Sequence, residues 1–452
     1  MTTALTFLIL IISLLMVVLV PALTPPEAAD LCGPTTVVDT AQAMLVCWLL
    51  AGVVALVISR SRTHAEFLLN LFLAALLVRM LVAAAIFVFN GQPFFGGDAF
   101  TYDTFAYLQV QGWHGDYFAA TVAHAYVNKA GTGWGMIYLV AGIYELIGRN
   151  MLATQLINAV LGAATAPLIY LSAWSVFEKA RVARLAAYAV AFLPSLVLWS
   201  AQGLKDGPIM FFLAMAILAT LKLGEKVSLW YLLMLLGALV CVLAFRFYVF
   251  YMLLMAIIGS LVIGSRAITY TSLARQFVLL LLLTTTMSLC AAVLGARKHF
   301  EVYGSLKQVQ VNRLDASTSA TSGFGRDIDV STAGGAVSAV PEGLVYLFLA
   351  PFPWQLGSAR QSITIPEMLI WWLCIPILVI GVWHSIKHRF RRALPILIFT
   401  VVLTLAYSVF QGNVGNAYRQ RAQLLIFYYI FVSAGFDVMR GSRAASRRLP
   451  HV

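Results

Sequence analysis

Apolar segments long enough to cross a membrane recur along this chain, and they limit its fold more than any other feature. A transmembrane helix needs about 20 consecutive apolar residues. Only 11% of the residues are charged and 61% are hydrophobic, whereas soluble domains carry about 25% charged residues. In lipid the backbone must satisfy its own hydrogen bonds, which favours helices. The sequence therefore predicts an all-α polytopic integral membrane protein. The expected spans are 3–23, 41–59, 67–89, 151–176, 183–200, 208–224, 228–245, 248–265, 276–295, 365–385, 393–411 and 422–439.

The apolar piece 134–148 decides the topology, because it is short for a crossing. If it does not cross, the short basic connections all face the cytoplasm, as the positive-inside rule requires. If it crosses, the run KHRFRR (387–392) faces outward instead. We therefore expect a juxtamembrane helix here and about 12 spans with both ends cytoplasmic, with 13 as the alternative. The first span has no basic residue before it, so we expect a retained helix and not a signal peptide.

The net positive charge, the histidines and the cysteines exclude several classes of function. The net charge of +12 follows from the basic connections, so it reflects topology and not nucleic-acid binding. His114 and His124 are ten residues apart, which is no metal-binding spacing. Five dispersed cysteines make neither a disulfide framework nor a metal site. They are Cys32, Cys47, Cys241, Cys290 and Cys374.

This topology divides the chain into five parts and places two large loops outside the cytoplasm. The second loop has a Ser/Thr/Gly-rich middle, DASTSATSGFGRDIDVSTAGGA (315–336), which is typical of disorder. The stretch 340–354 after it is apolar and ends in aromatics and prolines, so we expect it at the membrane surface. The parts are 1–89 with three helices, the loop 90–150, the helical core 151–295, the loop 296–364, and 365–452 with three helices and a basic tail.

The first outer loop carries two acids on one expected helix. Gly96 and Gly97 precede Asp98, so Asp98 is expected to begin this helix and cap its free N–H groups. Asp103 is five residues later, which places it about 140° around the helix from Asp98. The two carboxylates therefore do not share a face. We expect Asp98 at the mouth of the helix and Asp103 on its flank, with different roles.

A few charged residues lie on the short outer connections, where the positive-inside rule does not favour cations. We expect them to gather with Asp98 and Asp103 on one side of the membrane. A carboxylate beside several cations suits transfer from a phosphate-linked donor, because the acid takes the acceptor proton and the cations neutralise the departing phosphate. These residues are Lys205, Asp206, Arg246, Arg419 and Arg421.

The sequence resembles the GT-C membrane glycosyltransferases, in particular the protein O-mannosyltransferases and the lipid A aminoarabinose transferase. GDAFTYDTFA resembles the acidic motif of their first outer loop, with Asp98, Tyr102 and Ala106 in matching places. The short apolar segment 135–148, the helix 151–177 and RLAAYAVAFLPSLVLWSAQGLKD (184–206) continue the likeness. RQRAQLLIFYYIFVSAG (419–435) resembles the Arg-rich entry to their last helix. The resemblance covers about 90–225 and, more loosely, the last 40 residues.

The resemblance implies an enzyme of a bacterial inner membrane that faces the periplasm or exterior. It would move a sugar from a polyprenyl-phosphate-linked donor to a glycan, lipid or protein acceptor. Asp98 would be the catalytic base and Asp103 a second acid, with Tyr102, Lys205, Asp206, Arg246, Arg419 and Arg421 binding substrate. Two departures matter: Ala99 stands where relatives often have another acid, and three spans precede the loop instead of one. A divalent cation, Mg²⁺ or Mn²⁺, is therefore left open as a cofactor.

Two alternatives remain open from the sequence. A polysaccharide polymerase or ligase with diphosphate-linked donors would depend on the outer arginines more than on the acid. A lipid or glycan transporter would need functional charge at mid-membrane depth, and only Arg79, within the third span, fits that requirement. Because a buried arginine costs several kcal/mol unless it has partners, Arg79 must find them within the bundle.

Overall fold

A computed structural model describes residues 2–61, 64–130, 134–226, 228–263, 304–318 and 322–446. These residues are almost entirely α-helical, and their one β-bridge joins Gly323 to Asn413, so the all-α prediction is confirmed. Seven of the described helices are long and apolar enough to cross a membrane, or eight if one bent pair forms a single span. The expected span 276–295 and Cys290 lie outside the described residues. The total of 12 spans therefore stays a prediction.

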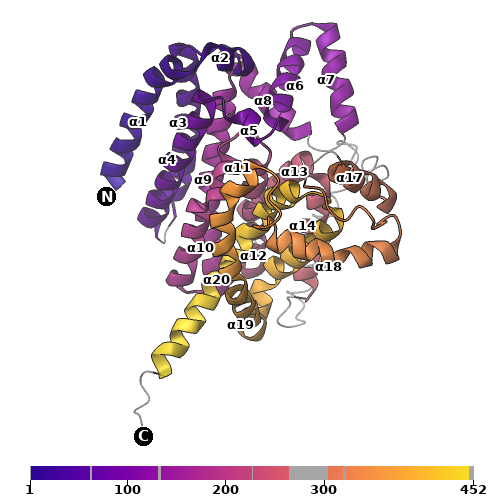
Figure 1. The fold of residues 1–452 in the computed structure, drawn as a ribbon. Coiled ribbons are helices and arrows are strands. Elements are labelled where there is room, and N and C mark those ends of the chain that lie inside the picture. The colour runs from indigo at the N-terminus through magenta and orange to yellow at the C-terminus, as the bar shows by residue number, and fades with distance from the viewer. Residues whose placement is uncertain are drawn as a thin grey trace. The chain divides into compact units, whose positions relative to one another are not determined.

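The chain forms two compact units, and Figure 1 labels the helices of both. Unit 1 comprises residues 1–168 and 190–211, and unit 2 comprises 169–189 and 212–452. The boundaries between the units fall inside three helices, α9 (Met151–Phe177), α10 (Ala180–Phe192) and α12 (Asp206–Glu225). The units therefore do not follow the loop boundaries that hydropathy suggests.

Unit 1 begins with three long helices, in keeping with the three spans expected before the acidic loop. They are α1 (Thr2–Leu23), α3 (Val37–Ser59) and α4 (Ala65–Val88), which contact one another, and the short α2 (Pro26–Cys32) contacts α4. Helix α3 starts four residues before the expected span. Thr36 and Asp39 form a capping box there, in which Asp39 N–H donates to Thr36 Oγ1 at 3.1 Å and Thr36 N–H to Asp39 Oδ2 at 2.8 Å.

The first outer loop is folded into helices. They are α5 (Gln92–Phe95), α6 (Asp98–Trp113), α7 (Tyr117–Ala130) and α8 (Trp134–Ile147). Helix α6 packs against both α7 and α8. Helix α8 is the short apolar piece of the sequence, and its 14 residues are too few to cross a bilayer of about 30 Å at 1.5 Å per residue.

The expected span 183–200 is a pair of helices broken at Pro194, which together are long and apolar enough for one bent span. Helix α10 ends at Phe192 and α11 (Pro194–Ser200) starts after the extended residue Leu193, with a bend of 54° between them. Proline has no N–H to donate and disfavours helical backbone in the residue before it. The last carbonyls of α10 therefore need other donors.

Unit 2 is built around two long helices, α19 (Ala359–Phe410) and α20 (Val414–Ser446), which pack together along their length. Arg389 has non-helical backbone angles, so α19 is two helices joined at a kink. The expected spans 365–385 and 393–411 fall on these two helices, and the second helix ends at Phe410. Helices α13 (Leu229–Phe245) and α14 (Phe247–Ile263) pack on each other, and α14 also packs on α19.

The described part of the second outer loop contains α17 (Leu306–Thr318) and α18 (Ala333–Leu349), both in contact with α19. Residues 322–332 lie between these helices, in the stretch whose composition is typical of disorder, yet they make defined contacts. Arg326 Nη2 donates to the Ser317 carbonyl at 2.7 Å, and Val330 N–H donates to Gln310 Oε1 at 2.8 Å. Backbone hydrogen bonds also join this stretch to residues 412–414: Phe324 N–H donates to the Gly412 carbonyl, and Val414 N–H donates to the Ser322 carbonyl.

Candidate functional site

The acidic helix α6 presents its two aspartates in opposite environments. Asp98 is exposed, whereas Asp103 is buried and only 2% exposed. Asp98 begins the helix, as expected, but as its first residue, with Gly97 at the N-cap position. Gly96 supplies the turn, because its φ of +125° is one that other residues rarely adopt. The Asp98 carboxylate consequently lies at the N-terminal end of the helix, which is the positive end of the helix dipole.

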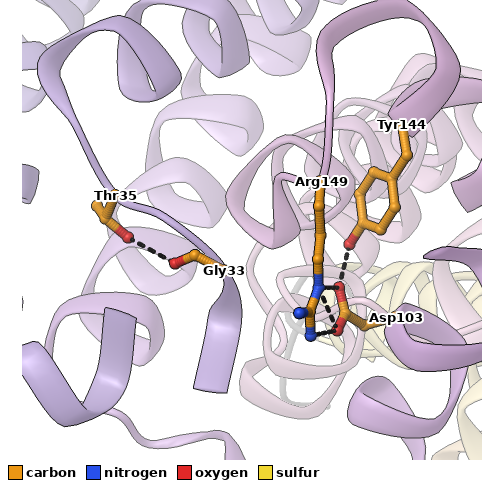
Figure 2. A network of polar contacts seen from close by, with 5 residues as sticks. All are labelled: Gly33, Thr35, Asp103, Tyr144 and Arg149. Carbon is orange, nitrogen blue, oxygen red and sulfur yellow. Dashed lines mark hydrogen bonds and ion pairs between the residues drawn. The ribbon is translucent and has the colours of Figure 1, made fainter. Parts of the chain in front are cut away.

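Asp103 is the centre of a buried polar network (Figure 2). Arg149 donates from Nη2 to Asp103 Oδ2 at 2.5 Å and from Nε to both carboxylate oxygens, at 3.1 and 3.3 Å. The Tyr144 hydroxyl donates to Asp103 Oδ1 at 2.5 Å. This two-pronged pairing is the strong form of an arginine–carboxylate contact. It fixes α6 to α8 and to the connection that leads into α9.

The surroundings of Arg149 are shaped to hold it. Gly33 has a φ of +87°, and a Cβ atom there would lie 3.5 Å from Arg149 Cγ and Cδ. The guanidinium also lies over the Tyr107 ring, 5.3 Å from its centre. The hydrogen bond to Asp103 raises the pKa of Arg149, and burial, followed by the Asp103 charge, raises the pKa of Tyr144 well above its usual range. Arg149 and Tyr144 were missed in the sequence because Arg149 lies in the long outer loop and Tyr144 in an apolar helix.

A second polar network brings the start of α6 next to the segment 201–206, also within unit 1. Gln92 Nε2 donates to Gln202 Oε1 and to the Gly96 carbonyl, both at 3.1 Å. A Cβ atom on Gly203 would lie 3.7 Å from Ala99 Cβ. The residue before Gly203 is therefore hydrogen bonded to the turn that precedes Asp98, and Gly203 itself lies against the residue that follows Asp98.

The segment 201–206 carries two of the expected site residues. Lys205 is half-buried, and Asp206, the first residue of α12, is fully buried. The segment is not helical, so its carbonyls need donors, and Asn158 Nδ2 donates to Gln202 O at 2.6 Å and Leu204 O at 2.7 Å. Lys205 and Asp206 thus follow closely on Gln202 and Gly203, the two residues of this segment that contact the start of α6 or the turn before it.

Helix α7 completes the surroundings of Asp98. Tyr126 stacks on Phe105 of α6, with ring centres 3.7 Å apart. Burial and then the negative charge of Asp98 raise the pKa of Tyr126. Tyr102 follows Asp98 by one turn on α6 and is 9% exposed. Asp98 is therefore set among aromatic side chains, with its own carboxylate exposed.

Unit 2 contains the three expected arginines, and hydrogen bonds within it link the segment of Arg246 to the segment of Arg419 and Arg421. Arg246 lies in extended backbone between α13 and α14 and is 3% exposed. Its Nη1 donates to the Tyr248 hydroxyl at 3.1 Å, and that hydroxyl donates to Gln420 Oε1 at 3.4 Å. Gln420 stands between Arg419 and Arg421. Arg246 is therefore linked to the Arg-rich start of α20.

The two neighbours of Gln420 differ. Arg419 is half-buried, whereas Arg421 is 2% exposed. Arg421 Nη1 donates to three backbone carbonyls, at Leu347, Phe348 and Ala350, over distances of 3.1 to 3.2 Å. These contacts hold the end of α18 and favour a structural role for Arg421. Donor binding by Arg421 stays a prediction.

The expected site residues thus fall into two groups. Unit 1 contains Asp98, Tyr102, Asp103, Lys205 and Asp206, and unit 2 contains Arg246, Arg419 and Arg421. Among the residues that the structure describes, no three His, Cys, Asp or Glu side chains are grouped so that they could hold a metal ion.

Residues 134–295 match the family model described as dolichyl-phosphate-mannose-protein mannosyltransferase. The match covers less than half of the chain. It starts at α8 and includes Arg149, the segment 201–206 and Arg246, while the acidic helix α6 precedes it. No match to a curated protein was found.

Three solved structures are similar to the chain at low identity. ArnT from Cupriavidus metallidurans, bound to undecaprenyl phosphate, is 15% identical with a TM-score of 0.43 over 69% of this chain and 52% of that one. The oligosaccharyltransferase AglB from Archaeoglobus fulgidus, with an inhibitory peptide and a dolichol-phosphate, is 14% identical with a TM-score of 0.39 over 71% and 44%. An apo oligosaccharyltransferase from Archaeoglobus fulgidus has a TM-score of 0.46 at 15% identity, over 86% and 52%. The chain spans about half the length of these proteins, and scores in this range do not establish a shared fold.

Proposed function

We propose that this chain transfers a sugar from a polyprenyl-phosphate-linked donor to a glycan, lipid or protein acceptor, with inversion at the sugar carbon. The acceptor oxygen attacks C1 of the sugar, the bond from C1 to the phosphate oxygen breaks, and the acceptor proton passes to Asp98. Polyprenyl phosphate leaves with the bonding electrons. The family match over 134–295 supports this class of donor, because the proteins that it describes are named for a dolichyl-phosphate sugar.

The single observation that carries the proposal is the setting of Asp98. Its carboxylate is exposed at the first residue of α6, and the turn before it is hydrogen bonded to the segment that bears Lys205 and Asp206. Five residues further on, the Asp103–Arg149–Tyr144 network fixes the same helix. A base of this kind must be both reachable and held in place. In this arrangement Asp98 is the base and Asp103 is the acid that positions α6.

The cations serve the departing phosphate. Lys205 and Arg246 are placed on connections between helices, and the link through Tyr248 and Gln420 joins Arg246 to the segment of Arg419. An arginine can bind two phosphate oxygens at once, whereas a lysine acts as a point charge. We assign phosphate binding to Arg246, Arg419 and Lys205, and substrate contact to Tyr102 and Asp206. The site would face the periplasm or exterior of a bacterial inner membrane.

The contacts of Arg79 argue against the transporter alternative. That alternative needed functional charge within the membrane, and Arg79 was its one candidate. Arg79 is 1% exposed and donates to three backbone carbonyls and to Ser200 Oγ. Its side chain therefore holds the broken helix and has a structural reason to be there.

The proposal is tested by a cleavage assay with purified protein in detergent. The probes are undecaprenyl-phosphate-linked sugars, a pentose and several hexoses, each labelled in the lipid and offered with a panel of acceptors. The proposal expects release of undecaprenyl phosphate that depends on the acceptor and requires no second compartment. Movement of intact labelled lipid between the leaflets of proteoliposomes, without cleavage of any donor, would contradict it and favour a transporter. Activity only with diphosphate-linked donors would favour the polymerase alternative.

A further inference from the structure

Four side chains of unit 2 form a line of hydrogen bonds that we call the Tyr248 bridge: Arg246, Tyr248, Gln420 and Gln411. Arg246 Nη1 donates to the Tyr248 hydroxyl at 3.1 Å, and the hydroxyl donates to Gln420 Oε1 at 3.4 Å. Gln411 Nε2 donates to the same Gln420 oxygen at 2.6 Å. The bridge connects the α13–α14 junction, α14, the end of α19 and the start of α20.

The Tyr248 hydroxyl has a fixed direction in this bridge. A phenol has one proton to donate and oxygen lone pairs that accept. Because Arg246 can only donate, the hydroxyl must accept from it and give its own proton to Gln420. The Tyr248 ring is held as well, edge-on to Tyr407 at 6.4 Å and to Phe410 at 5.9 Å between ring centres. The Tyr248 oxygen therefore offers Arg246 an acceptor at a defined place.

The Tyr248 hydroxyl is an uncharged acceptor, and this affects how Arg246 can bind an anion. An aspartate at this place would orient the guanidinium and also cancel its charge, whereas a hydroxyl orients it without adding negative charge. The contact uses one of the five N–H donors of the guanidinium group. The Tyr248 contact therefore orients a guanidinium whose planar fork suits two phosphate oxygens, and the hydroxyl itself does not offset its charge.

We propose that Tyr248, itself held by Gln420 and Gln411, is a positioning residue that sets Arg246 for the phosphate of the lipid donor. The inference rests on the proposed function, in which Arg246 binds that phosphate. Tyr248 acts through Arg246 and takes no part in the transfer of the sugar or the proton. Its loss therefore weakens donor binding and leaves the turnover of bound donor nearly unchanged.

The test measures affinity for undecaprenyl phosphate and the kcat and KM for an undecaprenyl-phosphate sugar, with purified full-length protein. Tyr248→Phe keeps the ring and removes the hydroxyl. A hydrogen bond that involves a charged group commonly contributes a tenfold effect or more, so affinity is expected to fall about tenfold and KM to rise about as much, with kcat within about threefold. Gln420→Met, which removes the acceptor of the Tyr248 proton, is expected to weaken affinity about threefold.

A matched control and a double variant make the result specific. Tyr231→Phe changes the same residue type near the start of α13, about 22 Å along the helix axis from Arg246, and is expected to leave affinity unchanged. In an Arg246→Ala background, Tyr248→Phe is expected to have no further effect. An equal loss in that background would overturn the inference, because the hydroxyl would then act independently of Arg246.

The outcomes separate this inference from the proposed function. If Arg246→Ala leaves the affinity for undecaprenyl phosphate unchanged, the assignment of Arg246 to the donor phosphate is wrong. If Arg246→Ala weakens affinity while Tyr248→Phe and Gln420→Met do not, donor binding by Arg246 stands and its positioning by Tyr248 is refuted. A melting temperature for each variant in the same detergent shows whether a loss reflects unfolding.

Discussion

Arg79 Nη1 donates to the carbonyl oxygen of Ala191 at 2.7 Å, across 112 positions of the sequence. Ala191 lies in the last turn of α10, just before the break at Pro194, where helix geometry leaves carbonyls without donors. Arg79 also reaches the Val190 carbonyl at 3.2 Å and Ser200 Oγ at 2.8 Å. One arginine thereby ties α4 to both halves of a broken helix, which leads directly into the segment that bears Lys205.

Replacement of Arg79 by methionine should strongly destabilise the protein. The change leaves buried carbonyls without a donor, and each such group costs roughly 1–3 kcal/mol. We expect a loss of about 3 kcal/mol or more, seen as a much lower melting temperature in detergent. Lys222→Met is the control, because Lys222 forms a more exposed pair with Glu225, and such pairs contribute about 1 kcal/mol or less. Equal melting temperatures for the two variants would contradict this role of Arg79.

A substitution at Gly162 of α9 tests how closely α9 packs against Arg79 and Ser200. A Cβ atom there would overlap the Ser200 side chain and approach Arg79 Nε to 3.0 Å. Gly162→Ala is therefore expected to lower the melting temperature, although alanine is the better helix former by about 1 kcal/mol. Gly52→Ala, on α3 with no atom within 4 Å of the new Cβ, should leave it unchanged or raise it. The opposite order would show that α9 does not pack closely at this junction.

Hydropathy and local punctuation predict much of this fold, because both act over short stretches of chain. They predict the first three spans, the helical structure of the apolar segments in the two outer loops, and the start of α6 near Asp98. The sequence contains a signal for the break at Pro194, namely a proline within an apolar run, but the length of that run favoured one continuous span. The packing of residues 322–332 could not be predicted from the sequence. Amino-acid composition does not reveal the partners with which Arg326 and Val330 form hydrogen bonds.

The candidate site was predictable only in part for the same reason. The residue types and their outer connections pointed to Asp98, Lys205 and Arg246. The ion pair between Asp103 and Arg149 could not be predicted, because these residues are 46 positions apart and no sequence-spacing rule relates them. The hydrogen bonds from Arg421 to three backbone carbonyls were likewise not predictable from its Arg-rich motif, because they reach residues more than 70 positions away.

The Asp103–Arg149 pair should show coupling in a double-mutant cycle. Asp103→Asn and Arg149→Gln each leave a buried or half-buried polar group poorly matched, so each single change should lower stability and turnover. The double variant removes both charges, and we expect a coupling free energy of about 1–3 kcal/mol in thermal or denaturant unfolding. Additive losses would mean that the pair does not hold α6. Lys179 and Asp437, an exposed pair, provide a cycle whose coupling should be about 1 kcal/mol or less.

The orientation of the chain is testable by cysteine labelling in intact cells. His388, in the basic run at the kink of α19, and Ser338, exposed on α18 in the second outer loop, are replaced by cysteine one at a time in a background without native cysteines. We expect Ser338→Cys to react with an impermeant thiol reagent and His388→Cys to react only after the membrane is permeabilised. The reverse pattern would place the proposed site in the cytoplasm.

Arg246 and Arg419 should affect the donor more than the chemical step. Arg246→Ala and Arg419→Ala are expected to weaken affinity for undecaprenyl phosphate, and lysine should restore it poorly where two oxygens are bound at once. Arg421→Ala should instead lower the melting temperature, because three carbonyls lose their donor. If Arg421→Ala leaves stability intact and abolishes donor binding, its structural assignment is wrong and its expected role as a phosphate ligand is restored.

The turnover of Asp98→Asn tests the central claim most directly. Asparagine keeps the size and polarity of the side chain at the first residue of α6 and removes its basicity. If Asp98 is the general base, turnover should fall roughly 10²–10⁴-fold, with the affinity for undecaprenyl phosphate and the melting temperature little changed. Asp116→Asn, an exposed acid just before α7, serves as the control and should keep its activity. Wild-type turnover in Asp98→Asn would contradict the account, and loss of turnover only in the arginine variants would favour the diphosphate-dependent polymerase.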